Sequence, residues 1–209
     1  NALSSANENT IKTLINTDAL SDVQVQTTYN WLLGADINDL DGDGNVAELR
    51  QAFGDQINQK PETVFSGADD MTVYFGDNAG FLNAIDGKTG DHLYSFMPPE
   101  FLADATELAG TATSGSKLYG IDGALKNFEL IDPTTKAKVQ YLAFSFGKGG
   151  SGVYILDVTD RDQPSVVFRT SAKNTGYDNL GEAWATPELT CMNTPNGIKR
   201  VAIFGAGYS

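Results

Sequence analysis

Oxygen-bearing side chains alternate along a short run between Asp39 and Glu48, and this spacing could bind a hard cation. Carboxylates stand at the first, third and fifth places, Gly44 permits a sharp turn at the sixth, and the seventh place typically offers a main-chain carbonyl. The pattern is typical of a calcium-binding loop. The predicted metal ligands are Asp39, Asp41, Asp43, Asn45 and Glu48.

The loop departs from an EF-hand at its end, because Arg50 stands at the twelfth position, where a bidentate Glu normally completes the coordination. Glu48 comes two places early, so Glu48, Asp36 or water would have to complete the oxygen shell. The alternative is a solvated turn, since Asp, Asn and Gly favour turns for backbone reasons. Against this alternative, three carboxylates within five residues repel one another unless a cation neutralises them.

Composition restricts the remaining chemistry. The 209 residues include 14 basic and 27 acidic side chains, and a net charge of -13 argues against nucleic acid as a partner. The single cysteine, Cys191, excludes an internal disulfide, and with His92 as the only histidine a Cys/His zinc site or a His-based triad is disfavoured. No apolar run approaches the roughly 18 residues of a membrane span. Both ends resemble cuts, so we expect a piece of a longer protein.

The segments on the two sides of the loop differ in their periodicity. Residues 1–35 carry apolar side chains at helical spacing, with Ser21 and Asp22 placed to cap a second helix, which predicts a helical lead-in at the end of an upstream domain. Residues 36–61 comprise the calcium-binding loop and a polar connector. Residues 62–209 alternate with period two between Gly- and Asp-rich turns, which predicts short antiparallel strands.

A sequence echo within the strand region predicts repeated sheets. The run 81–86, followed by Phe96, resembles the run 152–157, followed by 166–168. Short strands that end at an Asp-marked turn, followed by a strand with an aromatic residue, describe blades of a β-propeller. The echo spans about seventy residues, more than a compact blade, so an insertion or an intervening blade must fill the difference. Further strands are predicted at 118–121, 128–131 and 139–146, with a helical segment at 98–108.

These strands would make three or four blades, fewer than a closed propeller needs. The predicted fold is therefore mainly β, an incomplete β-propeller preceded by a short helical lead-in and an EF-hand-like calcium loop. A glycine-rich run, 147–152, leads into a strand rather than a helix, which indicates a glycine hinge and not a phosphate cradle.

Several landmarks in one order resemble the C-terminal propeller region of the PilC/PilY family, the type IV pilus tip-associated adhesins. The resemblance covers roughly residues 31–209. The glycine-rich run that leads into Tyr-Ile-Leu-Asp-Val-Thr-Asp is fairly specific, whereas the blade motif alone also resembles quinoprotein repeats. The landmarks are 39–45 with Glu48 and Arg50 before Gly54 and Asp55, 76–90 with 94–96, 147–160, 184–187 and 201–209.

The resemblance implies an extracellular protein at the tip of a type IV pilus, with a modified propeller, seven-bladed in full, that binds calcium. It implies roles in pilus biogenesis, adhesion and twitching motility, with minor pilins, pilus tip proteins and an unknown surface receptor as partners. Two departures matter. The segment 56–61 lacks the His that family members often carry there, and no Arg-Gly-Asp tripeptide suggests an integrin ligand.

The alternative is a fragment of a quinone-dependent, PQQ-type propeller dehydrogenase, because such enzymes share Asp-x-x-Thr-Gly turns like 86–90 and also hold calcium. Their sites assemble ligands from separate blades, whereas the oxygens here are contiguous. Cys191 alone cannot form the vicinal disulfide that often lies against the quinone. We therefore predict a non-enzymatic protein with no catalytic residues. The aromatic residues that could be core anchors or binding-surface groups are Trp31, Trp184, Tyr177 and Tyr208.

Overall fold

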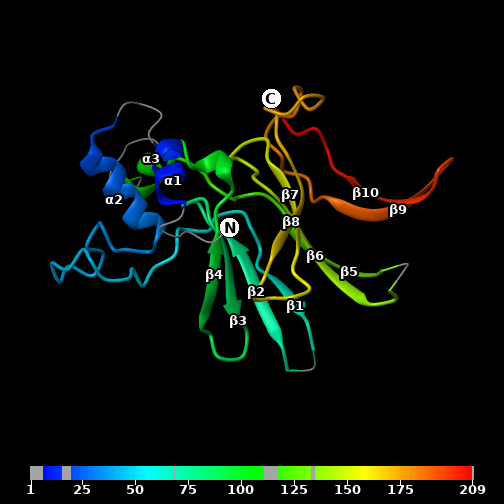
Figure 1. Cartoon of the computed structure of the whole chain (residues 1–209), viewed down its shortest axis with the longest axis horizontal. Coiled ribbons are helices and arrows are strands. Elements are labelled where there is room, and N and C mark those ends of the chain that lie inside the picture. Colours follow the sequence, from blue (N-terminus) through cyan, green and yellow to red (C-terminus); the bar gives the residue numbers. More distant parts are fainter. Residues whose placement is uncertain (1–6, 16–19, 68, 111–116, 133–134, 209) are drawn as a thin grey trace. The chain divides into compact units, whose positions relative to one another are not determined.

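A computed structural model describes residues 7–15, 20–67, 69–110, 117–132 and 135–208. The chain forms two compact units (Figure 1). The first comprises 1–54 and 97–118, and the second comprises 55–96 and 119–209. Residues 1–6 and 16–19 of the predicted lead-in lie outside the described residues.

Short helices dominate the first unit, as the sequence predicts. The polar Ser21 begins the second helix with a capping box, in which its side chain accepts from the Gln24 main-chain N–H and Gln24 Oε1 accepts from the Ser21 main-chain N–H. The Thr28 and Thr106 hydroxyls lie 2.9 Å apart and link two of the helices. The elements are α1 (Glu8–Ile15), α2 (Asp22–Leu32), η1 (Pro99–Phe101) and α3 (Ala105–Gly110).

The helix α2 ends at Leu32, a few residues before the acidic loop. Gly34 has φ +101°, a left-handed conformation that a side chain would strain, and its main-chain N–H donates to Trp31 O at 2.9 Å. Trp31 itself is 5 % exposed and belongs to the core of this unit. The loop is therefore attached to a well-packed helix.

Three antiparallel sheets make up the second unit, and two of them have four strands in sequence order. The first sheet contains β1 (Glu62–Phe65), β2 (Met71–Gly76), β3 (Leu82–Asp86) and β4 (His92–Phe96). The second contains β5 (Leu125–Ile131), β6 (Lys138–Ser145), β7 (Val153–Asp157) and β8 (Ser165–Thr170). The hairpin contains β9 (Glu188–Thr194) and β10 (Gly197–Ile203).

The sequence echo corresponds to equivalent strands of the two four-stranded sheets, so the predicted repetition is confirmed. Between the third and fourth strands, the register shifts at Ala84/Ile85 in one sheet and at Ile155/Leu156 in the other. A bulge re-aims the side chains that follow it and is a built feature rather than a defect. Both third strands end at an Asp whose carboxylate accepts main-chain N–H bonds from the following turn.

Aromatic rings fill the space where the two four-stranded sheets meet. Tyr154 and Phe144 are fully buried, with ring centroids 5.3 Å apart, and Phe96 from β4 lies 5.9 Å from Tyr154. Large rings in such arrangements dominate the apolar area of a core. The glycine-rich run passes close to these rings, since a Cβ at Gly152 would clash with the ring of Phe146, which stacks on Phe144 and Tyr154.

Two details differ from the sequence prediction. The strand predicted at 118–121 is wrong, because this segment is irregular and is held instead by the Ile121 main-chain N–H, which donates to Asp77 O at 2.9 Å. The strand β9 was missed, because its residues are mostly exposed and carry no clear alternation. The mainly β fold is confirmed, but no sheet closes on itself among the described residues, so the propeller and its blade number stay predictions.

No helix in the described part of the chain combines the length and the apolar character that crossing a bilayer requires.

Candidate metal site

The acidic loop is closed at its base by a short antiparallel contact within the first unit. The Asp36 main-chain N–H donates to Glu48 O at 2.8 Å, and the Arg50 main-chain N–H donates to Gly34 O at 2.8 Å. A bridge pairs Ala35 with Leu49 between these bonds. This closure brings Asp36, before the loop, next to Glu48 at its end.

Within the loop, carboxylates fold the backbone around themselves. Asp39 Oδ1 accepts from the Gly44 main-chain N–H at 3.0 Å, and Asp43 Oδ1 accepts from the Asn45 main-chain N–H at 2.7 Å. Gly42 and Gly44 have φ of +75° and +85°, and Asp39 has φ +48°, which is uncommon outside glycine. The resulting turns hold the acidic side chains close together.

Two groups of carboxylates each place one oxygen per residue within 4.8 Å of the others, and each group could hold a metal ion. The first group is Asp39, Asp41 and Asp43, and the second is Asp36, Asp41 and Glu48. Asp41 belongs to both groups. The four predicted carboxylates therefore fall in two overlapping groups, and Asp36 joins Glu48 and Asp41 in the second.

Asp36 is the unusual member, because it is 4 % exposed whereas most of the loop is exposed. Its Oδ2 accepts from the Leu40 main-chain N–H at 2.9 Å, but its Oδ1 is buried without a hydrogen-bond partner. A buried carboxylate oxygen without a donor is costly. A cation beside Asp36 would remove that cost.

The pKa of Glu48 also indicates that the loop lacks a countercharge. The pKa of the Glu48 carboxyl is raised above its ordinary value, chiefly by the negative charge of Asp43, then by desolvation and by the charges of Asp41 and Asp36. Like charges disfavour the ionised form of each neighbour. The loop thus carries more negative charge than its own residues neutralise.

The remaining predicted residues take other positions. Asn45 Nδ2 donates to Glu48 Oε2 at 3.4 Å, so its side chain supports Glu48. Arg50 turns to Trp31, with its guanidinium 5.0 Å from the ring centroid and Nη1 donating to Trp31 O at 2.5 Å. The Arg50 guanidinium is therefore engaged by the ring and the main chain of Trp31.

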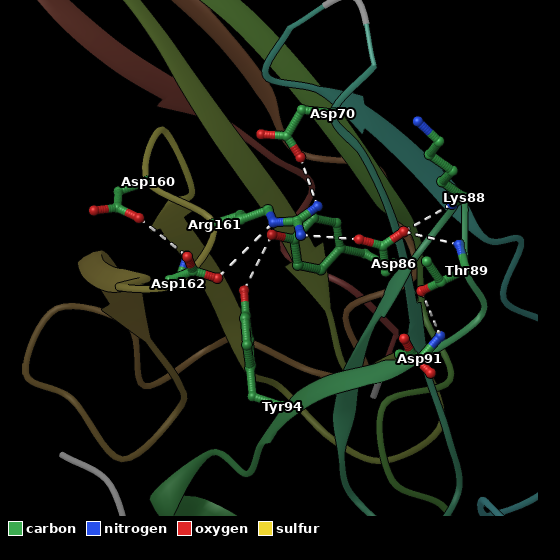
Figure 2. Close-up of polar contacts among 10 residues, drawn as sticks. Asp70, Asp86, Lys88, Thr89, Asp91, Tyr94, Asp160, Arg161 and Asp162 are labelled. Carbon is green, nitrogen blue, oxygen red and sulfur yellow. Dashed lines mark hydrogen bonds and ion pairs between the residues drawn. The ribbon is translucent and has the colours of Figure 1, made fainter.

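A second acidic cluster, which sequence reasoning missed, lies in the second unit and is shown in Figure 2. Arg161, in the turn after β7, places Nη1 2.5 Å from Asp70 Oδ1 and Nη2 2.9 Å from Asp86 Oδ2, while Nε lies 3.8 Å from Asp162 Oδ1. The pKa of Asp86 is lowered to about 2, chiefly by the main-chain N–H bonds of Thr89 and Lys88 and then by Arg161. This cluster supplies its own countercharge.

The single histidine hydrogen-bonds with a neighbouring strand residue, whereas the single cysteine is exposed. Ser95 Oγ lies 2.9 Å from His92 Nε2 but donates to Asn83 Oδ1 at 2.6 Å, so the hydroxyl proton is directed away from the imidazole. Cys191 is exposed on β9. Among the aromatic candidates, Trp184 and Tyr208 are 40 % and 75 % exposed.

The class of protein defined by these features is mainly β, with an acidic loop that could hold a metal ion. No protein-family model matches the chain. A curated relative, the type IV pilus biogenesis factor PilY1 homolog of Xylella fastidiosa, is 32% identical over 108 residues, which is 51% of this chain and 9% of that protein.

The crystal structure of the Pseudomonas aeruginosa PilY1 C-terminal domain is similar with a TM-score of 0.48 and 24% identity, over 68% of this chain and 26% of that one. The PilC/PilY resemblance inferred from the sequence motifs is confirmed by the similarity to the Xylella fastidiosa protein. The chain matches only 9% of the length of its curated relative.

Proposed function

We propose that the acidic loop binds Ca²⁺ through Asp36, Asp39, Asp41, Asp43 and Glu48, with the main-chain carbonyl of Asn45 as a further ligand. Calcium accepts about six to eight oxygen ligands in a flexible geometry, and this set supplies that number and kind. The unpaired, buried Oδ1 of Asp36 is the observation that carries the proposal. Bound calcium would neutralise the repulsion that raises the pKa of Glu48.

We further propose that the chain acts as part of a non-enzymatic, extracellular pilus tip protein in type IV pilus biogenesis, adhesion and twitching motility. Minor pilins, other tip proteins and a surface receptor would be its partners. The similarity to a type IV pilus biogenesis factor supports this proposal. The metal would stabilise the loop at the end of α2 and so maintain the unit from which the loop extends.

The binding proposal is tested by calorimetric titration of calcium into the full-length protein, with thermal melting in calcium and in chelator. We expect binding in the wild type and its loss in Asp41→Ala, because Asp41 belongs to both carboxylate groups. A ligand at one hundred times its dissociation constant stabilises by about 2.7 kcal/mol, so chelation should lower the melting temperature measurably. Asp91→Ala, an exposed carboxylate in a turn of the second unit, is the matched control.

An identical melting temperature of the wild type in calcium and in chelator would refute the metal site. In cells, Asp41→Ala should reduce surface pili and the twitching zone, while Asp91→Ala should leave both unchanged. Normal piliation and twitching in cells that carry Asp41→Ala would separate the metal from pilus function.

A further inference from the structure

A polar pocket of about 360 Å³ opens in the second unit, where the β1–β2 hairpin faces β5, β6 and the turn after β7. Its volume lies within the range of about 300–1,000 Å³ typical of small-molecule sites. The residues that line it and carry the argument are Phe65, Ser66, Glu129, Lys138, Gln140 and Thr159.

Gln140 lines this pocket and carries a buried, unpaired hydrogen-bond acceptor. The residue is 6 % exposed, and its Nε2 donates to Phe65 O at 3.1 Å and to Glu129 Oε2 at 3.2 Å. Its Oε1 is buried without a partner. Buried amide oxygens are normally paired, so a small movement of the Gln140 side chain that exposes Oε1 to a ligand's donor would remove the cost of leaving it unpaired.

The charged groups of the pocket neutralise each other. Lys138 Nζ lies 2.8 Å from Glu129 Oε1, and the pKa of Glu129 is lowered, chiefly by the hydrogen bond from Lys138. Neither an anion nor a cation would therefore meet an uncompensated opposite charge. A neutral ligand with hydroxyl groups can still donate to Glu129 and accept from Lys138.

Hydroxyl and aromatic groups complete the lining. Thr159 Oγ1 accepts from the Gln140 main-chain N–H at 2.9 Å, which leaves its own proton for donation, and Ser66 adds a second hydroxyl. Phe65 is 58 % exposed, and its ring offers a flat π-face to the partially positive C–H groups of a ligand.

The hairpin wall of the pocket is fixed on two sides. Gln140 Nε2 donates to Phe65 O at the end of β1, and Arg161 forms its 2.5 Å ion pair with Asp70 on the other side of the same turn (Figure 2). Arg161 also holds Asp86 in the next turn. A wall that is fixed before binding lowers the ordering cost of a ligand.

From these groups we infer a binding site for a neutral saccharide, in which hydroxyls pair with Gln140, Glu129 and Thr159 while the C–H face of the sugar ring rests on Phe65. A sugar presents donors, acceptors and an apolar face together, which matches an unpaired acceptor, a neutralised ion pair and an exposed ring. The inference concerns a site of the second unit and does not depend on the metal.

The test uses the full-length protein with calcium present and saturation-transfer difference NMR against glucose, galactose, mannose and N-acetylglucosamine, with sialic acid as a charged comparison. We expect at least one neutral sugar to bind, more tightly than sialic acid. Phe65→Ala should weaken that binding by about 2- to 10-fold. Because Phe65 is exposed, this change should leave the fold intact.

Gln140→Leu should weaken the same sugar by about 10-fold, and Phe53→Ala, an exposed phenylalanine in the first unit, should have no effect. If Gln140→Leu does not fold, Phe65→Ala alone decides. No signal from any neutral sugar, unchanged binding in Phe65→Ala, tighter binding of sialic acid, or a peptide that binds at Phe65 where no sugar does would each overturn the inference.

Discussion

The acidic loop of the first unit and the Arg161 cluster of the second unit gather carboxylates in opposite ways. Around Arg161 a guanidinium lies among Asp70, Asp86 and Asp162, and the pKa of Asp86 falls to about 2 under main-chain and guanidinium hydrogen bonds. In the loop the acidic groups face each other, and the pKa of Glu48 rises. The direction of the pKa shift thus separates carboxylates that lie beside a guanidinium from carboxylates that mainly face one another.

The largest effect that would sharpen this comparison is expected for Asp36→Asn. The amide keeps an acceptor for the Leu40 main-chain N–H but cannot offer the cation a charged Oδ1. We expect calcium affinity to fall by more than about 10-fold, since even outer-shell changes cost 10- to 100-fold. In chelator the variant should melt no lower than the wild type, because one repelling charge is gone. A calorimetric titration that finds unchanged affinity would remove Asp36 from the site.

A smaller effect is expected for Arg161→Gln, which leaves three carboxylates without their shared cation. The Arg161 side chain is 24% exposed and solvent screens its ion pairs, so the loss of stability should be small. Thermal melting should show the same decrease in calcium and in chelator. Arg169→Gln, on the neighbouring β8, is the control for loss of one positive charge. A decrease that disappears in chelator would contradict the independence of the two clusters.

The smallest effect concerns pH. A raised carboxyl pKa means that the folded loop binds protons more tightly than the unfolded chain, so this contribution to stability is present below the unfolded pKa and is lost as pH rises through the folded pKa. Calcium needs the ionised carboxylate, so calcium affinity should weaken as pH falls through the raised pKa of Glu48. Glu48→Gln should flatten that part of the pH profile. An unchanged profile in Glu48→Gln would assign the titration to another carboxyl.

For Asp86 the sign is reversed. Its lowered pKa contributes stability above the unfolded pKa, and that contribution is lost as pH falls through about 2. The Arg161 cluster should therefore persist at acidities at which the loop has already released its cation. We therefore expect the two clusters to differ in their response to acid as well as in their response to chelator.

Local patterns made much of this structure predictable. The Ser21 cap, the alternating strands and the Asp-marked turns depend on near neighbours in sequence, so most of these elements were predicted where they occur. The carboxylates of the loop were found for the same reason, because their spacing itself builds the turns. The strand predicted at 118–121 failed because a hydrogen bond to the distant Asp77 decides its path.

Contacts between distant residues were not predictable from one sequence. Arg161 meets Asp70 across 91 positions, and Gln140 meets Phe65 across 75. The burial of Asp36, which distinguishes it from the exposed carboxylates, depends on packing in the first unit rather than on the loop motif. Period and spacing therefore identified the acidic loop, but not the buried, unpaired oxygen of Asp36 beside it.

The exposed thiol of Cys191 has a practical consequence, because it is the only cysteine in the sequence and lies on the β9–β10 hairpin. A maleimide fluorophore or spin label would attach at one defined place without any engineered substitution. The signal of the label would report on the motion of the hairpin. The same labelling site would be present in every variant discussed above, because none of those substitutions changes Cys191.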